Sequence, residues 1–213
     1  NGEPILSGGH QNNRPSDMNK KYRMVENVFE ELDSPSEWYY DKDSKKLYYW
    51  PEAGVDIQNT IVEGVHLKHL VEIIGDEKLP VKGVSIEGVH FEHAQRTIME
   101  DYEPLLRSDW TIYRGGALFI EGTEDITVKD CEFSNLGGNV IFVSNYNRNA
   151  IITGNHIHDC GASAISFVGS PTAVRSPSFQ YNKFVPITEM DTIKGPANNM
   201  YPKACTVDNN LIY

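Results

Sequence analysis

Apolar and polar residues alternate along the chain from about residue 70 onward, and the alternation recurs in blocks. Each block begins with three residues, of which the first and third are apolar and the middle one is expected to face outward. Two small or polar residues follow, and then a second group of three with the same pattern. Four blocks share this pattern, at residues 84–91, 126–133, 150–157 and 205–212. Alternation with a period of two is typical of β-strands. Each block therefore predicts two short strands joined by a corner.

A second type of strand precedes the later blocks, and its spacing gives the length of the repeat. Leu118 and Ile141 are 23 positions apart, and Ile141 and Ile165 are 24 apart. An earlier copy lies at residues 71–75. About two dozen residues is one coil of a parallel β-helix, in which each turn stacks on the last. We therefore predict an all-β fold, a right-handed parallel β-helix.

Stacking of the coils predicts columns of similar side chains. The inward columns that we expect are Ile86, Val128, Ile152 and Val207 in one, and Phe91, Phe133, Ile157 and Ile212 in another. At a corner, Asn155 and Asn210 share a column with Cys131 and Val89. Buried asparagines in such a column can form side-chain ladders that satisfy the backbone of the turn.

The period is broken twice. Phe91 and Leu118 are 27 positions apart, where the equivalent residues of later coils are 8 apart. Phe167 and Val207 are 40 positions apart, where their counterparts are 8 or 9 apart. The resulting two long loop insertions contain residues 95–114 and 175–202. Long loops on a rigid solenoid usually carry binding or catalysis, although they also serve simply to cover the coils.

A different pattern fills residues 1–65, ahead of the coils at 66–213. The aromatic runs EWYY (37–40) and LYYW (47–50) flank the polar DKDSKK (41–46), which predicts an aromatic hairpin. Residues 25–32 predict a short helix that ends near Pro35. We expect the hairpin to pack on the solenoid, and a platform for stacking sugars is the alternative.

Composition and charge narrow the classes of partner. The formal net charge of −11 excludes a nucleic-acid partner, because phosphate binding needs a basic face. No run approaches the roughly 18 apolar residues of a membrane span, so we expect no membrane insertion. The three cysteines, Cys131, Cys160 and Cys205, form no metal-binding pair, and we expect three separate, buried and reduced thiols.

Several motifs together carry a resemblance to a known family. They are GGHQNNR (8–14), VENVFEELD (25–33), EWYY (37–40), LYYWP (47–51), GG (137–138), SNYNR (144–148), GASAI (161–165) and AVRSP (173–177). With these motifs the chain resembles glycoside hydrolase family 141, a group of bacterial β-helix enzymes with fucosidase and xylanase members. The resemblance implies a secreted, periplasmic or cell-surface enzyme that cleaves poly- or oligosaccharides by carboxylate acid/base catalysis. It implies no organic cofactor, and a structural calcium ion is left open.

Members of that family are much longer than this chain, and the resemblance places their catalytic acids on later coils. The present sequence ends at Tyr213 within a strand pattern. We therefore expect an internal fragment, inactive by itself, whose coils continue in a parent protein.

Hydrolysis of a glycosidic bond requires two carboxyl groups that face one cleft. The candidates are Asp101 and Asp109 on the first insertion and Asp191 on the second, with Glu100, Glu103 and Glu189 nearby. A solvated loop charge is the more frequent role of any one such residue. The sequence therefore selects no pair.

Outward-facing residues supply candidates for sugar binding. His90, Glu132, His156 and Leu211 share one outward column, and Glu92, Ser134, His158 and Tyr213 share the next. His156 and His158 point to the same face, where we expect them to bind sugar hydroxyls, and we assign no metal site.

Arginines supply the remaining binding candidates. Arg175 follows a coil strand, and Arg148 and Tyr146 are expected in a neighbouring turn one coil earlier. A guanidinium suits a carboxylate or sugar hydroxyls, and bonds to backbone carbonyls within a turn are an equal alternative.

Two other functions remain open. A polysaccharide lyase needs a Lys or Arg base and often calcium, but lysines such as Lys129 are sparse on the coil strands. A non-catalytic adhesin or carbohydrate-binding solenoid would show no close pair of carboxylates.

Overall fold

The computed structural model describes residues 21, 26–104, 111–176 and 185–213. The chain divides into two compact units. The described residues of the smaller unit lie within Asp17–Gly64, and those of the larger lie within Val65–Tyr213.

The smaller unit is built on an antiparallel hairpin of β1 (Trp38–Asp41) and β2 (Lys46–Tyr49), preceded by a single 3₁₀ turn, η1 (Phe29–Glu31). Phe29 packs edge-on against both Tyr39 and Tyr48, with ring centroids 5.3 Å apart in each case. The aromatic hairpin is confirmed. The expected helix over 25–32 is too long, because Asn27 has a φ of 55°, which a right-handed helix does not accommodate. Its side chain instead accepts a hydrogen bond from the backbone N–H of Tyr40.

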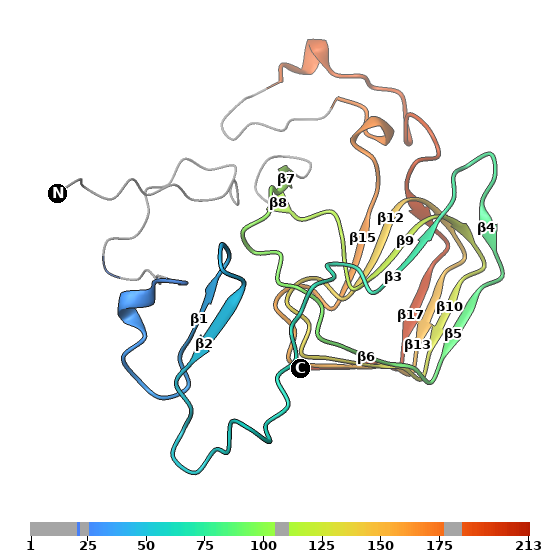
Figure 1. Cartoon of the computed structure of the whole chain (residues 1–213). Coiled ribbons are helices and arrows are strands. Elements are labelled where there is room, and N and C mark those ends of the chain that lie inside the picture. Colours follow the sequence, from blue (N-terminus) through green and yellow to red (C-terminus); the bar gives the residue numbers. More distant parts are fainter. Residues whose placement is uncertain (1–20, 22–25, 105–110, 177–184) are drawn as a thin grey trace. The chain divides into compact units, whose positions relative to one another are not determined.

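The larger unit is built from three parallel sheets (Figure 1). The first sheet has the order β15-β12-β9-β3, formed by Ile165–Val168, Ile141–Arg148, Leu118–Glu124 and Val71–Ile74. Two short strands extend it, β4 (Val81–Lys82) beside β9 and β16 (Pro202–Lys203) beside β12. The second sheet has the order β17-β13-β10-β5, formed by Thr206–Asp208, Ile151–Thr153, Thr127–Lys129 and Ser85–Glu87. The third has the order β18-β14-β11-β6, formed by Leu211–Ile212, His156–Ile157, Glu132–Ser134 and His90–Glu92.

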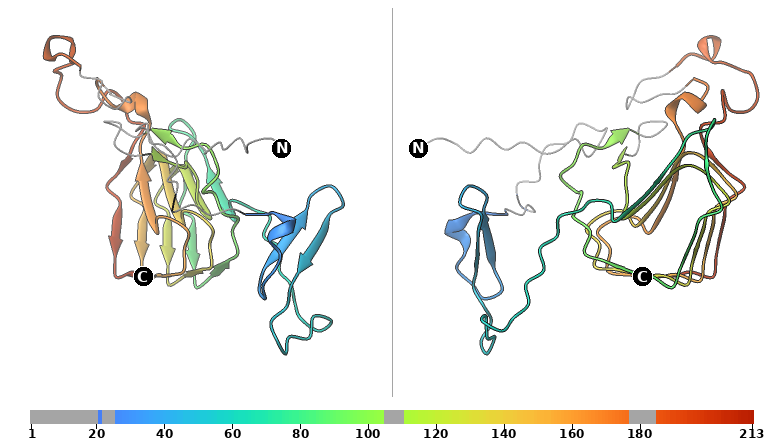
Figure 2. Two further views of the ribbon diagram at one scale, coloured as in Figure 1. Left: turned by 90° about the vertical axis from the view of Figure 1, so that its left-hand side faces the viewer. Right: turned by 45° about the vertical axis from the view of Figure 1, so that its right-hand side comes forward.

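The strands of each sheet lie side by side in the order of the coils (Figure 2), and their register is the one that the sequence repeat predicts. Leu118 and Ile165 both pair with Ile141, so one inward position recurs from coil to coil. On the third sheet the rings of Phe91 and Phe133 stack 4.7 Å apart inside the coil. Alternation therefore places the apolar side chains of the inner coils inside, where full burial of each contributes about 1.5–3 kcal/mol. Val207 and Ile212, which were predicted to lie in the same inward columns, belong to the last coil and are 46% and 50% exposed.

Three columns of residues with positive φ make the corners. The corner between the first and second sheets uses Gly83, Asp125, Asn149 and Ala204, with φ of 68°, 57°, 56° and 57°. The corner between the second and third sheets uses Gly88, Asp130, Gly154 and Asn209. The corner that follows the third sheet uses His93, Asn135 and Asp159. Glycine, asparagine and aspartate enter this region at low cost, which explains their recurrence at these positions.

An asparagine ladder supports the second of these corners. Asn155 is buried, and its amide oxygen accepts a hydrogen bond from the backbone N–H of Cys131 (3.0 Å). Its amide nitrogen donates to the carbonyl of Val128 (3.0 Å) and to the amide oxygen of Asn210 (2.9 Å). The ladder predicted from the sequence is confirmed.

The strands of the first sheet bend part-way along their length. Gly122, with a φ of 64°, lies against Gly75, so closely that a Cβ at Gly122 would come within 2.1 Å of the Gly75 carbonyl. One coil on, the pairing register shifts between Ser144 and Asn147. Strand β12 nevertheless continues through this bend as far as Arg148.

Two segments interrupt the coils. Residues 93–117 separate β6 from β9 and carry an antiparallel pair, β7 (Glu103–Pro104) and β8 (Thr111–Ile112). Residues 169–201 separate β15 from β16 and carry the 3₁₀ turns η2 (Pro171–Ala173) and η3 (Ile187–Glu189). Within the described ranges, no helix is long and apolar enough to span a lipid bilayer.

The first of these segments and His69, which lies ahead of β3, together cover part of the outer face of the first sheet. Phe119 and Phe142 alternate with the core residues of their strands and so face outward, yet they are only 9% and 0% exposed. His69 stacks on Phe119 with ring centroids 5.3 Å apart, and the guanidinium of Arg114 lies 6.0 Å from the centre of the Phe142 ring. The side of this sheet that would otherwise face solvent is therefore a second apolar layer.

The cysteines are less uniform than the sequence predicts. All three are free, but only Cys131 is buried, and Cys160 and Cys205 are partly exposed. The prediction of three buried thiols is wrong for these two. Partial burial still raises the pKa of both thiols above the ordinary value.

Candidate functional site

A cluster of charged and polar side chains gathers around Arg114 on the outer face of the first sheet. We define the Arg114 cluster as Glu103, Arg114, Glu121, Ser144 and Asn145. Arg114 binds Glu103 through Nε (2.8 Å) and Nη2 (2.5 Å). Its Nη1 donates to the hydroxyl of Ser144 (2.8 Å) and to the amide oxygen of Asn145 (3.3 Å). One side chain thus joins β7 to the bend of β12.

The same guanidinium also reaches the root of the second long segment. Arg114 Nη1 donates to the carbonyl of Val168 (3.2 Å), and Nη2 donates to the carbonyl of Gly169 (3.1 Å). Val168 is the last residue of β15, and Gly169 opens the segment that follows. Residues that precede β9 and residues that follow β15 therefore meet at one side chain.

A second carboxylate lies on the other side of Ser144. Glu121 accepts hydrogen bonds from the Ser144 hydroxyl (2.5 Å) and from the side-chain amide of Asn145 (2.9 Å). Glu121 and Ser144 are register partners on β9 and β12, so the stacking of the coils brings them together. The cluster contains two carboxylates, Glu103 and Glu121, linked through a guanidinium and a hydroxyl.

Both carboxyl groups of this cluster accept hydrogen bonds, Glu103 from Arg114 and Glu121 from Ser144 and Asn145. A general acid needs a pKa raised toward neutrality. The described carboxyl groups whose pKa clearly departs from its ordinary value are all lowered. They are Asp41, Asp76, Glu92, Glu124 and Asp191. None of these five carboxyl groups is therefore marked as a proton donor by its pKa.

The predicted binding pair Tyr146 and Arg148 is placed differently from the expectation. Both lie on β12 and not in a turn, because β12 continues past the bend to pair with β16. Arg148 Nη1 donates to the carbonyls of Asn147 and Tyr201, at 2.7 Å each. Its Nη2 donates to the carbonyl of Asn199 (3.0 Å). Arg148 thereby fastens the end of the 169–201 segment to the coils.

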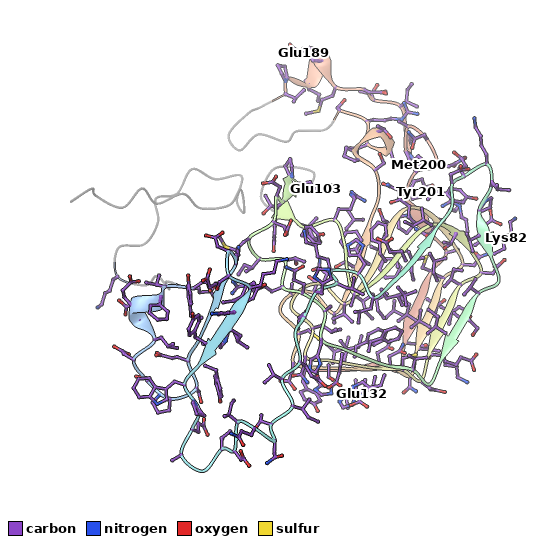
Figure 3. All side chains as sticks on the ribbon, viewed as in Figure 1. Lys82, Glu103, Glu132, Glu189, Met200 and Tyr201 are labelled. Carbon is purple, nitrogen blue, oxygen red and sulfur yellow. The ribbon has the colours of Figure 1, made fainter. Side chains whose placement is uncertain are left out.

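Aromatic rings and a charge pair surround that arginine. Its guanidinium carbon lies 4.2 Å from the ring centre of Tyr146 and 5.4 Å from that of Tyr201. The Tyr146 hydroxyl donates to Glu124 (2.7 Å), which also pairs with Lys82 (2.6 Å). Figure 3 places Lys82 and Tyr201 on the side of the coils where β4 and β16 flank the first sheet. The hydrogen bond from Lys82, and then that from Tyr146, holds the pKa of Glu124 below its ordinary value.

Arg175 and Asp191 pair with each other inside the 169–201 segment. Arg175 Nη1 binds Asp191 (2.8 Å), while Nε and Nη2 donate to the carbonyls of Gly195 (3.0 Å) and Pro196 (3.2 Å). The backbone N–H of Ile193, and then Arg175, lowers the pKa of Asp191. These contacts match the alternative in which Arg175 fastens a turn, and they hold Asp191 as an anion.

The remaining acidic candidates lie on the 93–117 segment. Asp101 is exposed, between Glu100, which pairs with Lys68 (2.7 Å), and Glu103 of the Arg114 cluster. Asp109 lies outside the described residues. Of the described acids named from the sequence on this segment, Glu103 is the one that contacts the Arg114 side chain at the first sheet.

His156 and His158 lie on the outer face of the third sheet, away from the Arg114 cluster. Figure 3 places Glu132, their neighbour, on the opposite side of the coils from Glu103. The two imidazole rings are 4.4 Å apart, and His158 contacts Asp159 through Nδ1 (2.8 Å) and Glu132 through Nε2 (3.3 Å). Asp159 first, and Glu132 second, raise the pKa of His158 above its ordinary value. The predicted role of these histidines in sugar binding stays a prediction.

Sequence reasoning did not find the Arg114 cluster as a unit. Glu121 and Ser144 occupy the same position on equivalent strands, so their column can be read from the repeat once each predicted strand is extended by one residue. Arg114 lies in a segment without periodicity, and no pattern in the sequence indicates which strand it contacts.

Comparison with known proteins agrees with this architecture. The family model described as "right handed beta helix region" matches residues 46–212. No curated protein and no solved structure gave a match. Because the match covers most of the chain and coincides with three stacked parallel sheets, the chain belongs to the family of right-handed β-helix proteins.

Proposed function

We propose that this chain is part of a glycoside hydrolase, and that its saccharide binds on the outer face of the first sheet against the Arg114 cluster. The observation that carries the proposal is the meeting of Glu103, Arg114 and Glu121 at this face. Residues from both long segments contribute to it, as is usual for a binding site on a rigid scaffold.

The fold alone leaves three functions open, because β-helix regions are shared by glycoside hydrolases, lyases and adhesins. Ionised carboxylates that accept hydrogen bonds are suited to sugar hydroxyls. A lyase that recognises uronic acids needs cationic groups for the substrate carboxylate, but Arg114 already binds Glu103 with two of its nitrogens. This pairing favours a neutral sugar over a uronic acid and so argues against a lyase.

In this proposal each group has a stated role. Arg114 positions Glu103, and Ser144 and Asn145 position Glu121. Both carboxylates accept hydrogen bonds from sugar hydroxyls. We assign the carboxylic acid that protonates the leaving group to a residue outside this cluster, because Arg114, Ser144 and Asn145 already donate to both of its carboxyl groups.

The test compares the natural protein that carries this chain with two variants, on xylan and fucosylated oligosaccharides. We expect release of new reducing ends by the unmodified protein. Glu121→Gln keeps the shape of the side chain but removes its charge, and should lower kcat/KM by roughly 10–100-fold, the loss expected when a charged hydrogen-bonding group is removed. Glu87→Gln, on the outer face of the second sheet, is the matched control and should leave the rate unchanged.

Three outcomes would overturn the proposal in different ways. Products with an unsaturated, ultraviolet-absorbing sugar end would identify a lyase. Binding of sugars without turnover by the unmodified protein would identify a carbohydrate-binding solenoid. Hydrolysis with equal rates for Glu121→Gln and Glu87→Gln would keep the enzyme class and reject the Arg114 cluster as its binding site.

A further inference from the structure

The outer face of the third sheet brings together a second group of chemically active side chains. Glu132 on β11 and His156 on β14 are register partners, and His158 follows His156 by two residues. One ligand atom from each of the three lies within 4.8 Å of the other two. Among the described residues, no other group of three histidine, cysteine or acidic side chains has its ligand atoms this close together.

The spacing suits a first-row divalent metal ion. Ligand atoms about 2.0–2.1 Å from a tetrahedral zinc ion lie about 3.4 Å from one another. His158 Nε2 and Glu132 Oε1 are already 3.3 Å apart. The third ligand atom, from His156, lies within 4.8 Å of both, so it has to move closer for all three to bind one tetrahedral ion. Two imidazoles and one carboxylate form a ligand set that zinc and its neighbours accept, whereas calcium and magnesium prefer oxygen ligands alone.

The neighbours of His158 also prepare it for this role. Its Nδ1 lies 2.8 Å from Oδ2 of Asp159. A metal-binding histidine usually donates its second ring N–H to a carboxylate, which fixes the tautomer and turns the free lone pair toward the ion. Here that lone pair belongs to Nε2, the atom that faces Glu132. Asp159 lies at the corner that follows the third sheet, where the chain turns through its φ of 50°.

A fourth polar group stands beside the histidines. The Tyr213 hydroxyl is 3.1 Å from His156 Nε2, and the Tyr213 ring stacks on His158 with centroids 5.5 Å apart. Tyr213 directly follows β18, the strand beside β14. Residues from three successive coils thus surround one point on the surface.

We propose that Glu132, His156 and His158 bind a divalent transition-metal ion of the zinc class. The ion links β11 to β14 across the third sheet, and Asp159 positions His158. The carboxylates of Glu132 and Asp159 offset the two positive charges of the ion. The site lies on a different sheet from the Arg114 cluster, so the metal-site proposal does not depend on the proposed glycoside hydrolase function.

The experiment titrates tag-free protein, stripped of metal, with Zn²⁺ in a calorimeter. We expect about one ion per chain, with Ca²⁺ and Mg²⁺ binding far more weakly. His158→Ala should weaken Zn²⁺ binding at least tenfold. Asp159→Asn removes only the positioning carboxylate and should weaken it by roughly 10–100-fold. His66→Ala, an exposed histidine outside the site, is the control and should bind as the unmodified protein does.

Two further measurements separate this site from adventitious binding. Co²⁺ should give visible absorption bands in the unmodified protein and in His66→Ala, but not in His158→Ala. Zn²⁺ should raise the Tm of the unmodified protein, because a ligand that binds only the folded state stabilises it. Each variant is compared with itself with and without metal, so a loss of stability in a variant does not confuse the result. Unchanged Zn²⁺ affinity in both His158→Ala and Glu132→Gln would overturn the proposal, as would the absence of binding by the unmodified protein.

Discussion

Arg114 holds Glu103 through two parallel hydrogen bonds, one from Nε and one from Nη2, each to a different carboxylate oxygen. The geometry is the bidentate pairing that only a guanidinium makes with a carboxylate. The remaining Nη1 contacts reach β12, so the pair fastens the 93–117 segment to the first sheet.

Arg114→Lys should therefore loosen this segment although it preserves the charge. Lysine offers a single nitrogen and loses one of the two bonds to Glu103 as well as the contacts to Val168 and Gly169. We expect a loss of about 1–3 kcal/mol in the free energy of unfolding, from hydrogen bonds that involve a charged group. Hydrogen exchange should become faster at residues 111–116. Arg175→Lys is the control, and equal protection of 111–116 in the two variants would contradict the interpretation.

Gly122→Ala should be among the most destabilising single changes in the coils. A side chain at this position is unfavourable because its φ is positive, and the added methyl group would also lie 2.1 Å from the Gly75 carbonyl. Gly88 has nearly the same φ, 65°, but nothing within 4 Å of its Cβ position, so Gly88→Ala carries the backbone cost alone. Urea unfolding should show about 1–2 kcal/mol for Gly88→Ala and about 3–5 kcal/mol for Gly122→Ala. Equal values would mean that Gly75 moves aside without cost.

The coils were predictable from the sequence because their physics is local and periodic. Apolar residues recur at the spacing of one coil, so the pairings of Ile141 with Leu118 and Ile165 follow from counting. The corners follow in the same way, since glycine, asparagine and aspartate mark positions of positive φ. Ala204, which has a φ of 57° at a corner, carries no such signal.

The Arg114 cluster was not predictable because it joins a periodic part of the chain to an aperiodic one. The repeat gives the positions of Glu121 and Ser144, but the path of residues 93–117 depends on how they cover Phe119 and Phe142. Tyr146 and Arg148 were misplaced for a related reason. Asparagines in SNYNR indicate a turn, whereas pairing with β9 and β16 on both sides keeps that stretch in strand β12.

Asn155→Ala should show how much the corner ladder contributes to stability. The change leaves the backbone N–H of Cys131 and the carbonyl of Val128 without their side-chain partner inside the coil. Buried polar groups that lose a partner cost about 1–3 kcal/mol each, so we expect a loss of about 2–6 kcal/mol in urea unfolding. Asn210→Ala, at the partly exposed next position of the ladder, should cost less. A larger loss for Asn210→Ala would contradict the view that burial sets the cost.

Glu124→Gln should change how the stability of the coils depends on acid. The hydrogen bond from Lys82 first, and that from Tyr146 second, lowers the pKa of Glu124 in the folded state below its ordinary value of about 4.5. A carboxyl group with a lowered pKa stabilises the fold above the unfolded-state pKa, and this stabilisation is lost as the pH falls through the folded-state pKa. The unmodified protein should therefore have a higher Tm than Glu124→Gln near neutral pH, and the difference should shrink steadily below about pH 4.5.

Lys82→Met tests the cause of that acid dependence. The Tm difference between the unmodified protein and Lys82→Met should narrow in the same way as the pH falls, because Glu124 in this variant loses its ion pair while its hydrogen bond to Tyr146 remains. A Tm difference between the unmodified protein and Glu124→Gln that persists unchanged to about pH 2 would show that Glu124 acts by shape and not by charge. An acid dependence that survives in Lys82→Met at full size would instead assign the effect to Tyr146, whose hydroxyl donates to the same carboxylate.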